Sequence, residues 1–291
     1  MTPLSEEDNE KIFQEEILPE YTEALNAEGA ALLTYVAGQS AAGKSSAIDA
    51  ERKRIERGYG TPIVLQRDLL RNFFPGYKDQ LRQLGAEGYK SSETDTWKWY
   101  EKLKDMARER RLPILIESTF RYPEAILKDI EDFSKAGFRI EIVALAVHPE
   151  VSKVGTFFRY EQEIELEGQG RFVDLKTQSD AIAGLVKTIA ALESNSKIAQ
   201  ITILNRVGKI LSQSSPKVEG DKKASNVLRA AHSILKPEEI QGVKRLWSQV
   251  FEKLKARKAP DNEYQTAKNA FAAFQNAAKR QTGNDDIGGI K

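Results

Sequence analysis

Residues 38–45 have the types and spacing of a phosphate-binding loop. They read GQSAAGKS, a full match to the pattern G-x-x-x-x-G-K-S/T. An apolar run precedes the loop and a segment of helix-forming composition follows it, so its backbone N–H groups can surround a phosphate at the positive end of a helix. We therefore predict ATP binding, with Lys44 at the β- and γ-phosphates and the Ser45 hydroxyl on Mg²⁺. The residues expected to hold the nucleotide are Gly38, Gln39, Ser40, Ala41, Ala42, Gly43, Lys44, Ser45 and Ser46.

A carboxylate follows the next apolar run of the chain. Asp68 comes shortly after the run at 62–65, where a predicted strand ends. A carboxylate at this place can ligate Mg²⁺ or accept the proton of an attacking hydroxyl group. The third interpretation is a helix N-cap for the segment 69–71.

A third apolar run, 113–116, ends at a further group of polar residues. Glu117 follows the run directly, and Thr119 and Arg121 lie within the next turn. Arginines at such places neutralise the charge of a phosphoryl group in transfer or bind substrate phosphates, although surface ion pairs are the simpler interpretation of each arginine alone. The candidates are Arg121, Arg159 and Arg171.

Strands and helices alternate along the first two thirds of the chain. This order predicts an α/β fold of P-loop NTPase type, a parallel sheet flanked by helices, in which polar residues at the carboxyl ends of the strands converge. Strands are expected at 32–37, 62–65, 113–116, 140–147 and 198–204, and helices at 46–53, 91–111, 123–136, 150–166 and 174–193.

We expect a kinase domain at 1–213 and a helical C-terminal extension at 214–291. The kinase domain begins with an N-terminal helical segment, 1–27, which Pro19 should kink. A loop is expected at 212–216, and beyond it the pattern predicts helices at 223–233, 237–257 and 261–280 and a frayed tail, with no strand. The extension either packs on the kinase domain and completes its core, which we favour, or forms a partner surface or inhibitor module.

Composition excludes several classes of function. The chain has 44 Lys and Arg against 43 Asp and Glu, so no overall charge attracts nucleic acid. It has no cysteine and two histidines, which excludes disulfides and thiolate catalysis and argues against a histidine metal site. The N-terminus is acidic and no apolar run approaches about 20 residues, so we expect a soluble cytoplasmic protein without membrane contact.

Over residues 30–210 the chain resembles the zeta-toxin family of P-loop kinases. Five separated motifs keep the family's order: GQSAAGKS at 38–45, DLLRNFFPGY at 68–77, Glu101 in a predicted helix, ESTFR at 117–121, and RYE at 159–161 with the loop arginine Arg171 after it.

The resemblance implies an ATP-dependent toxin that phosphorylates the sugar 3′-hydroxyl of UDP-N-acetylglucosamine and is inhibited by a small antitoxin protein. Lys44 and Ser45 would serve the nucleotide and metal, and Asp68 would be the catalytic base. The resemblance further implies a phosphate-stabilising set, Arg121, Arg159 and Arg171, and a substrate-binding set, Arg71, Glu101, Glu117 and Thr119.

One position departs from the family pattern. Phe74 stands where the family usually has histidine, which we expect to affect the choice of sugar more than the reaction. Two alternatives stay open: a P-loop kinase for another small hydroxyl metabolite, such as a different nucleotide-sugar or a dinucleotide, and a nucleotide-gated interaction protein. An intact Lys44, Ser45 and Asp68 argue against the last of these, because a binding module needs no catalytic base.

Overall fold

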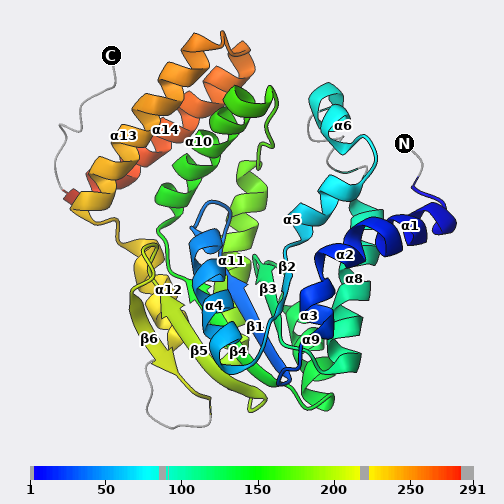
Figure 1. The fold of residues 1–291 in the computed structure, drawn as a ribbon. Coiled ribbons are helices and arrows are strands. Elements are labelled where there is room, and N and C mark those ends of the chain that lie inside the picture. The colour runs from blue at the N-terminus through cyan, green and yellow to red at the C-terminus, as the bar shows by residue number, and fades with distance from the viewer. Residues whose placement is uncertain (1–2, 85–89, 91, 217–222, 283–291) are drawn as a thin grey trace.

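A six-stranded sheet forms the centre of the computed structural model, which describes residues 3–84, 90, 92–216 and 223–282. The strand order is β2-β3-β1-β4-β5-β6; the first five strands are parallel and β6 runs antiparallel to β5 (Figure 1). The predicted α/β fold with a parallel sheet is confirmed. The strands are β1 Leu32–Ala37, β2 Ile63–Leu65, β3 Ile114–Ser118, β4 Arg139–Leu145, β5 Ile198–Leu204 and β6 Ile210–Ser214.

The pairing of β1 brings the predicted motifs to one edge of the sheet. β1 lies between β3 and β4, and Ala37 at its end pairs with Ser118 on one side and Ala144 on the other. The Gly38 N–H donates to the Ser118 carbonyl oxygen at 3.1 Å. The phosphate loop therefore begins directly beside the end of β3.

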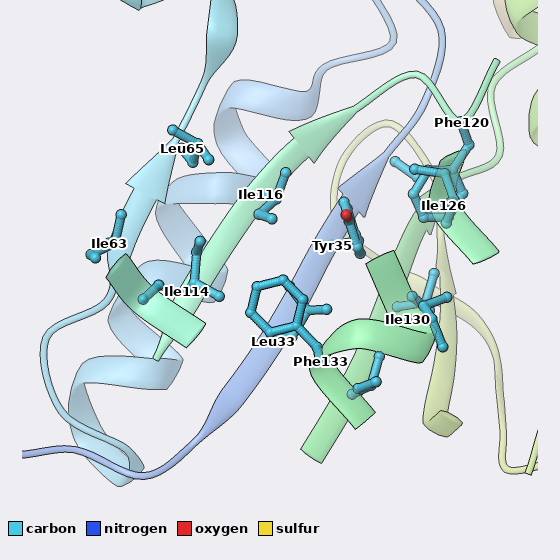
Figure 2. Packing of buried hydrophobic residues seen from close by; sticks show 14 of the residues in the cluster. Leu33, Tyr35, Ile63, Leu65, Ile114, Ile116, Phe120, Ile126, Ile130 and Phe133 are labelled. Carbon is cyan, nitrogen blue, oxygen red and sulfur yellow. The ribbon is translucent and has the colours of Figure 1, made fainter. Parts of the chain in front are cut away.

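Alternate side chains of β1 enter two different cores. Leu33 and Tyr35 pack with Ile116 and Phe133 in the first core, on one face of the sheet (Figure 2). Val36 packs in the second core, on the opposite face. This alternation follows from the two-residue period of a strand and buries the sheet on both sides.

Helices from both halves of the chain cover the two faces. On the first face lie α1 Glu6–Ile12, a π-helical stretch Phe13–Ile17, α2 Leu18–Glu20, α3 Thr22–Asn26, α5 Arg67–Leu70, a 3₁₀ turn Arg71–Phe73, α6 Tyr77–Leu84, α8 Glu93–Arg110, α9 Pro123–Lys135, α11 Leu175–Leu192 and α12 Ala224–Ser233. On the second face lie α4 Lys44–Gly58, α10 Pro149–Glu167, α13 Pro237–Ala256 and α14 Asp261–Thr282. No helix in these described ranges is long and apolar enough to cross a membrane.

Pro19 interrupts the N-terminal helix as expected. A proline lacks an N–H and its ring clashes with the carbonyl four residues earlier, here within Phe13–Ile17. That stretch is π-helical, so the wider turn accommodates the ring before α2 begins.

The C-terminal helices belong to the same cores as the sheet. Trp247 of α13 is fully buried, and its ring lies 5.0 Å from that of Phe157 on α10. Ala224 and Leu228 of α12 join the first core. Packing against the rest of the chain is thus the arrangement that the described extension adopts (Figure 1).

Strand β6 differs from the expected loop at 212–216 and crosses the expected boundary at 213. Its sequence ILSQS is mostly exposed, and β5 is the neighbour that supplies its hydrogen bonds. An edge strand of this kind carries little apolar signal, because pairing and not burial defines it. The expected frayed tail beyond residue 282 lies outside the described residues.

Candidate active site

The phosphate loop turns tightly between β1 and α4. Gly43 (φ +96°) and Ala41 (φ +56°) both adopt left-handed backbone conformations. A Cβ placed on Gly155 of α10 would lie 2.9 Å from the Ala41 Cβ. The loop therefore approaches α10 more closely than a side chain at position 155 would permit.

Lys44 bends back over its own loop. Its Nζ donates to the carbonyl oxygens of Gly38 (2.9 Å) and Gln39 (3.1 Å) and lies 3.4 Å from Glu117 Oε1. Burial lowers the pKa of Lys44, and the Glu117 charge opposes this effect. A phosphate in the loop would offer this cation anionic oxygens in place of backbone carbonyls.

The remaining loop residues divide into supports and exposed groups. The Gln39 side chain is buried, and its Nε2 donates to the Val147 carbonyl oxygen at 2.8 Å, which fixes the loop to the end of β4. Ala42 is also buried, whereas Ser45 and Ser46 are exposed in the first turn of α4. Gln39 and Ala42 thus shape the loop, and the two serines remain accessible to a ligand.

A cavity of about 250 Å³ lies at the carboxyl ends of β1, β2 and β3. We call it the acceptor cavity. It brings together seven of the predicted catalytic and substrate-binding residues with the loop residue Ser40. Its lining consists of Ser40, Lys44, Arg67, Asp68, Trp97, Tyr100, Glu117, Ser118, Thr119, Arg121, Tyr122, Ala125, Ile126, Asp129, Arg159 and Arg171.

Asp68 lies in the second position of α5 with its side chain 57% exposed. Gln66 occupies the N-cap, so the helix-cap interpretation of Asp68 is wrong. Asp68 Oδ2 instead accepts a hydrogen bond from Arg171 Nη1 at 2.5 Å. The carboxylate thus faces the cavity while paired with one of the predicted arginines.

The end of β3 and the segment after it present Glu117, Thr119 and Arg121 to the cavity. Glu117 Oε2 accepts a hydrogen bond from Gln66 Nε2 at 2.6 Å, and Arg121 pairs with Asp180 of α11 at 2.7 Å. Helix α11 passes so close to Arg121 that a Cβ on Gly184 would collide with its backbone. The position of this arginine therefore depends on helix packing as well as on its own ion pair.

Arg159 and Arg171 share one carboxylate. Glu163 Oε1 lies 3.5 Å from Arg159 Nε, and Glu163 Oε2 accepts a hydrogen bond from the Arg171 backbone N–H at 2.8 Å. This carboxylate links the α10 arginine to the loop arginine at the mouth of the cavity.

Two expected substrate contacts do not line the acceptor cavity. Arg71 is fully buried and binds Ser92 Oγ (2.8 Å) and Glu93, which joins α5 to the start of α8. Glu101 accepts a hydrogen bond from Lys104 Nζ at 2.8 Å. Arg71 thus connects two helices in this structure, and the substrate-binding roles of Arg71 and Glu101 stay predictions.

Phe74 also lies away from the acceptor cavity. Its side chain is 5% exposed and packs in the first core. Its position therefore gives no support to the expected effect on the choice of sugar, and the departure from the family pattern is accommodated in the core.

Eight of the lining residues were not among the predicted site residues, and three of these present a carboxylate or an exposed aromatic ring. Asp129 accepts hydrogen bonds from the Tyr35 hydroxyl (2.6 Å) and from Lys104 Nζ (2.8 Å). Trp97 and Tyr122 are largely exposed aromatic residues of the same cavity. The exposure of a polar or aromatic residue inside a cavity is a tertiary property that sequence spacing does not carry.

The oxygen atoms at this site suit a Mg²⁺ ion that takes some of its ligands from the protein and the others from a nucleotide and water. No group of three or more His, Cys, Asp and Glu side chains that could hold a metal occurs among the residues the structure describes. Mg²⁺ at phosphate-transfer sites takes few protein ligands and several from phosphates and water. The exposed Ser45 hydroxyl, with Asp68 and Glu117 at the cavity, matches that requirement.

The family model described as Zeta toxin matches residues 19–215, more than half of the chain. The chain belongs to the zeta toxin family. It is similar to the toxin PezT of Streptococcus pneumoniae serotype 4 (strain ATCC BAA-334 / TIGR4), with 26% identity over 125 residues, which are 43% of this chain and 48% of PezT. The match thus spans about half the length of this curated relative.

Solved structures share the fold at low sequence identity. The PezAT toxin–antitoxin system of Streptococcus pneumoniae matches with a TM-score of 0.72 and 19% identity, covering 87% of this chain and all of that chain. The AvrRxo1-ORF1:-ORF2 structure with ATP matches with a TM-score of 0.57 and 13% identity, covering 93% of this chain and 86% of that chain. These likenesses support the P-loop NTPase-type fold of this family member.

Proposed function

We propose that this chain is an ATP-dependent kinase that phosphorylates the sugar 3′-hydroxyl of a UDP-amino sugar, UDP-N-acetylglucosamine. The acceptor cavity carries the proposal. It places the phosphate-loop lysine, Lys44, beside Asp68 and the predicted arginines at one edge of the sheet. This is the combination that phosphoryl transfer to a hydroxyl group requires: a phosphate cradle, a base and positive charge.

The proposed reaction follows from these residues. The acceptor hydroxyl oxygen forms a bond to the γ-phosphorus of ATP, the bond from that phosphorus to the ADP oxygen breaks, and Asp68 takes the hydroxyl proton. Lys44, Arg121 and Arg159 stabilise the charge on the transferring group. A bound Mg²⁺ would neutralise phosphate charge. Glu117 and Thr119 are the proposed hydrogen-bonding partners of the sugar.

Turnover requires the pairs of the acceptor cavity to exchange partners. Arg171 holds Asp68 and Glu117 lies beside Lys44. The arrival of phosphate oxygens gives both cations a stronger anionic partner, which frees Asp68 to accept a proton and Glu117 to bind the sugar. We infer that substrate binding itself activates the base.

A role as a toxin with an antitoxin partner is part of the proposal. The family carries the name toxin, and the PezAT structure belongs to a toxin–antitoxin system. We therefore propose that a small antitoxin protein inhibits this chain and that the reaction depletes a cytoplasmic sugar nucleotide.

The direct test is product analysis with purified protein, ATP and Mg²⁺. UDP-N-acetylglucosamine, UDP-N-acetylgalactosamine and UDP-glucose are incubated in parallel, and mass spectrometry and ³¹P NMR detect a phosphate on the sugar. Lys44→Ala and Asp68→Asn serve as inactive controls. A product from UDP-N-acetylglucosamine supports the proposal. ATP consumption in cell extract without product from any of the three would assign another hydroxyl metabolite.

A further inference from the structure

We infer that Trp97 and Tyr122 form a stacking subsite for the nucleobase of the acceptor. The inference rests on the proposed function, since it concerns the acceptor of that reaction. The inference goes beyond that function, because it assigns two residues to the nucleobase of the acceptor and not to its sugar or phosphates.

Exposed aromatic side chains are concentrated in the acceptor cavity. Eight large apolar side chains are exposed among the residues described here, and the two aromatic ones, Trp97 (46%) and Tyr122 (61%), both line that cavity. Exposed apolar surface is unfavourable unless a ligand or partner covers it. The shared location of the two rings points to one ligand.

Trp97 is held in a fixed orientation. Its ring stacks on Tyr100 with a centroid distance of 5.2 Å and an interplanar angle of 18°, and Tyr100 itself is buried. A ring supported in this way loses little conformational freedom when a flat ligand packs against its accessible surface.

Cations accompany both rings. The Arg67 guanidinium lies 5.5 Å from the Trp97 centroid and the Arg121 guanidinium 5.2 Å from that of Tyr122. Aromatic surface next to arginine suits a ligand that joins a planar base to phosphates. The chemical class is thus a nucleoside diphosphate derivative, and a simple hydroxyl metabolite without a ring would leave both residues uncovered.

Tryptophan fluorescence tests the inference without turnover. Trp97 is exposed, whereas the other two tryptophans, Trp99 and Trp247, are fully buried. Titration with UDP should quench the emission saturably in the wild type and in Lys44→Ala, because the subsite does not use the phosphate loop. The quench should disappear in Trp97→Phe, although UDP still binds.

Affinity and kinetics supply the second readout. Stacking on an aromatic side chain contributes about 1–3 kcal/mol per base, which corresponds to roughly 5- to 150-fold in Kd. Trp97→Ala and Tyr122→Ala should therefore raise the Kd of UDP and the KM of the UDP-sugar by such factors with kcat nearly unchanged. Trp97→Phe and Tyr122→Phe should retain most of the affinity. Leu166→Ala is the control, since Leu166 is an exposed apolar residue outside the cavity.

The outcomes separate the inference from the proposed function. A UDP-sugar that is phosphorylated normally by both alanine variants, with no quench in the wild type, overturns the subsite and leaves the kinase intact. A quench that vanishes in Lys44→Ala also overturns it, since UDP would then occupy the phosphate loop. Failure of UDP to bind, with no product from any UDP-sugar, overturns both.

Discussion

Two ion pairs of this molecule differ in exposure and in number of hydrogen bonds. The first, Asp68–Arg171, lies at the acceptor cavity, and the second, Glu161–Arg257, joins the C-terminal helices to α10. The carboxylate of the first, Asp68, is 57% exposed and lies 2.5 Å from Arg171 Nη1. The carboxylate of the second, Glu161, is 2% exposed and receives two hydrogen bonds from Arg257, at 2.7 and 2.8 Å. The first pair can exchange partners in water, whereas the second cannot open without leaving a buried charge.

The interface pair also stands close to the site in sequence. Glu161 lies two residues after Arg159 on α10, and Arg257 contacts Glu263 and lies over the Tyr160 ring. The hydrogen bonds that Arg257 donates to Glu161 raise the pKa of Arg257, so this cation stays charged. The C-terminal helices thus fix α10, the helix that carries Arg159 of the acceptor cavity.

Breaking the interface pair should have the largest effect. Arg257→Ala leaves the Glu161 carboxylate buried without its main partner, which we expect to cost about 3–5 kcal/mol of unfolding free energy. Urea denaturation followed by circular dichroism measures this cost. Lys253→Ala is the matched control, because it removes a nearby cation, in the last turn of α13, that pairs with the exposed Glu165. Equal losses of unfolding free energy in the two variants would show that the buried pair contributes no more than the exposed one.

Removing the loop lysine should lower activity strongly and leave stability nearly unchanged. Lys44→Ala deletes a cation from the phosphate loop, and we expect the transition state to lose about 3 kcal/mol or more, roughly 150-fold in kcat. The unfolding free energy should change little, because burial already disfavours this charge. Initial rates in a coupled ADP assay measure this loss in kcat. Activity within a few-fold of wild type would remove the loop from catalysis.

Neutralising the exposed carboxylate should act on chemistry alone. Asp68→Asn keeps the size of the side chain and loses its basicity, so turnover should fall about 10²-fold while Mg-ATP binding stays near normal. Isothermal titration with a non-hydrolysable ATP analogue separates the two quantities. Weakened Mg-ATP binding would instead indicate that Asp68 is a ligand of Mg²⁺.

Acid should destabilise the protein through the start of α10. His148 caps this helix, with Nδ1 accepting from the Glu150 N–H at 3.2 Å, and burial lowers the His148 pKa to about 4. The unfolded chain then binds a proton at higher pH than the folded one, so stability falls as pH drops from about 6.5 towards 4. We expect a loss of about 2 kcal/mol.

Melting temperatures across that pH range test the role of His148. His148→Asn retains a capping side chain and removes the titration, so it should flatten the dependence. An unchanged slope in this variant would assign the acid sensitivity to other groups.

The smallest effects concern the arginines of the acceptor cavity. Lysine keeps the charge and loses the planar two-point grip, so Arg121→Lys, Arg159→Lys and Arg171→Lys should each lower kcat/KM by about 10-fold. Lys128→Ala, which removes a surface ion pair with Asp132, is the control and should leave activity unchanged. Near-wild-type kinetics for all three lysine variants would indicate that these arginines only form surface ion pairs.

Local patterns were sufficient to predict most of the framework. The phosphate loop and the five parallel strands are signalled by apolar runs and glycine spacing, and these depend on neighbours in sequence. Strand β6 escaped prediction because it is defined by pairing with β5 at an exposed edge.

Side-chain roles were harder to predict where they depend on packing. Arg71 and Asp68 stand three residues apart, yet one is fully buried against α8 and the other faces the cavity. Trp97 has the sequence signature of an amphipathic helix residue, and its exposure in the cavity depends on how α8 packs against α5 and β2. Such differences depend on tertiary packing, which cannot be read from the spacing of residues in the sequence.

The contact between Ala41 and Gly155 has a consequence for related sequences. A Cβ on residue 155 would lie 2.9 Å from the Ala41 Cβ, so the sizes of the two side chains are linked across more than a hundred positions. Substitutions at these positions should covary among family members: alanine or serine at 155 is expected together with glycine at 41. In directed evolution, a side chain at position 155 should be accepted only together with glycine at 41, whereas Ala41→Gly alone creates no clash and suits the positive φ of this residue.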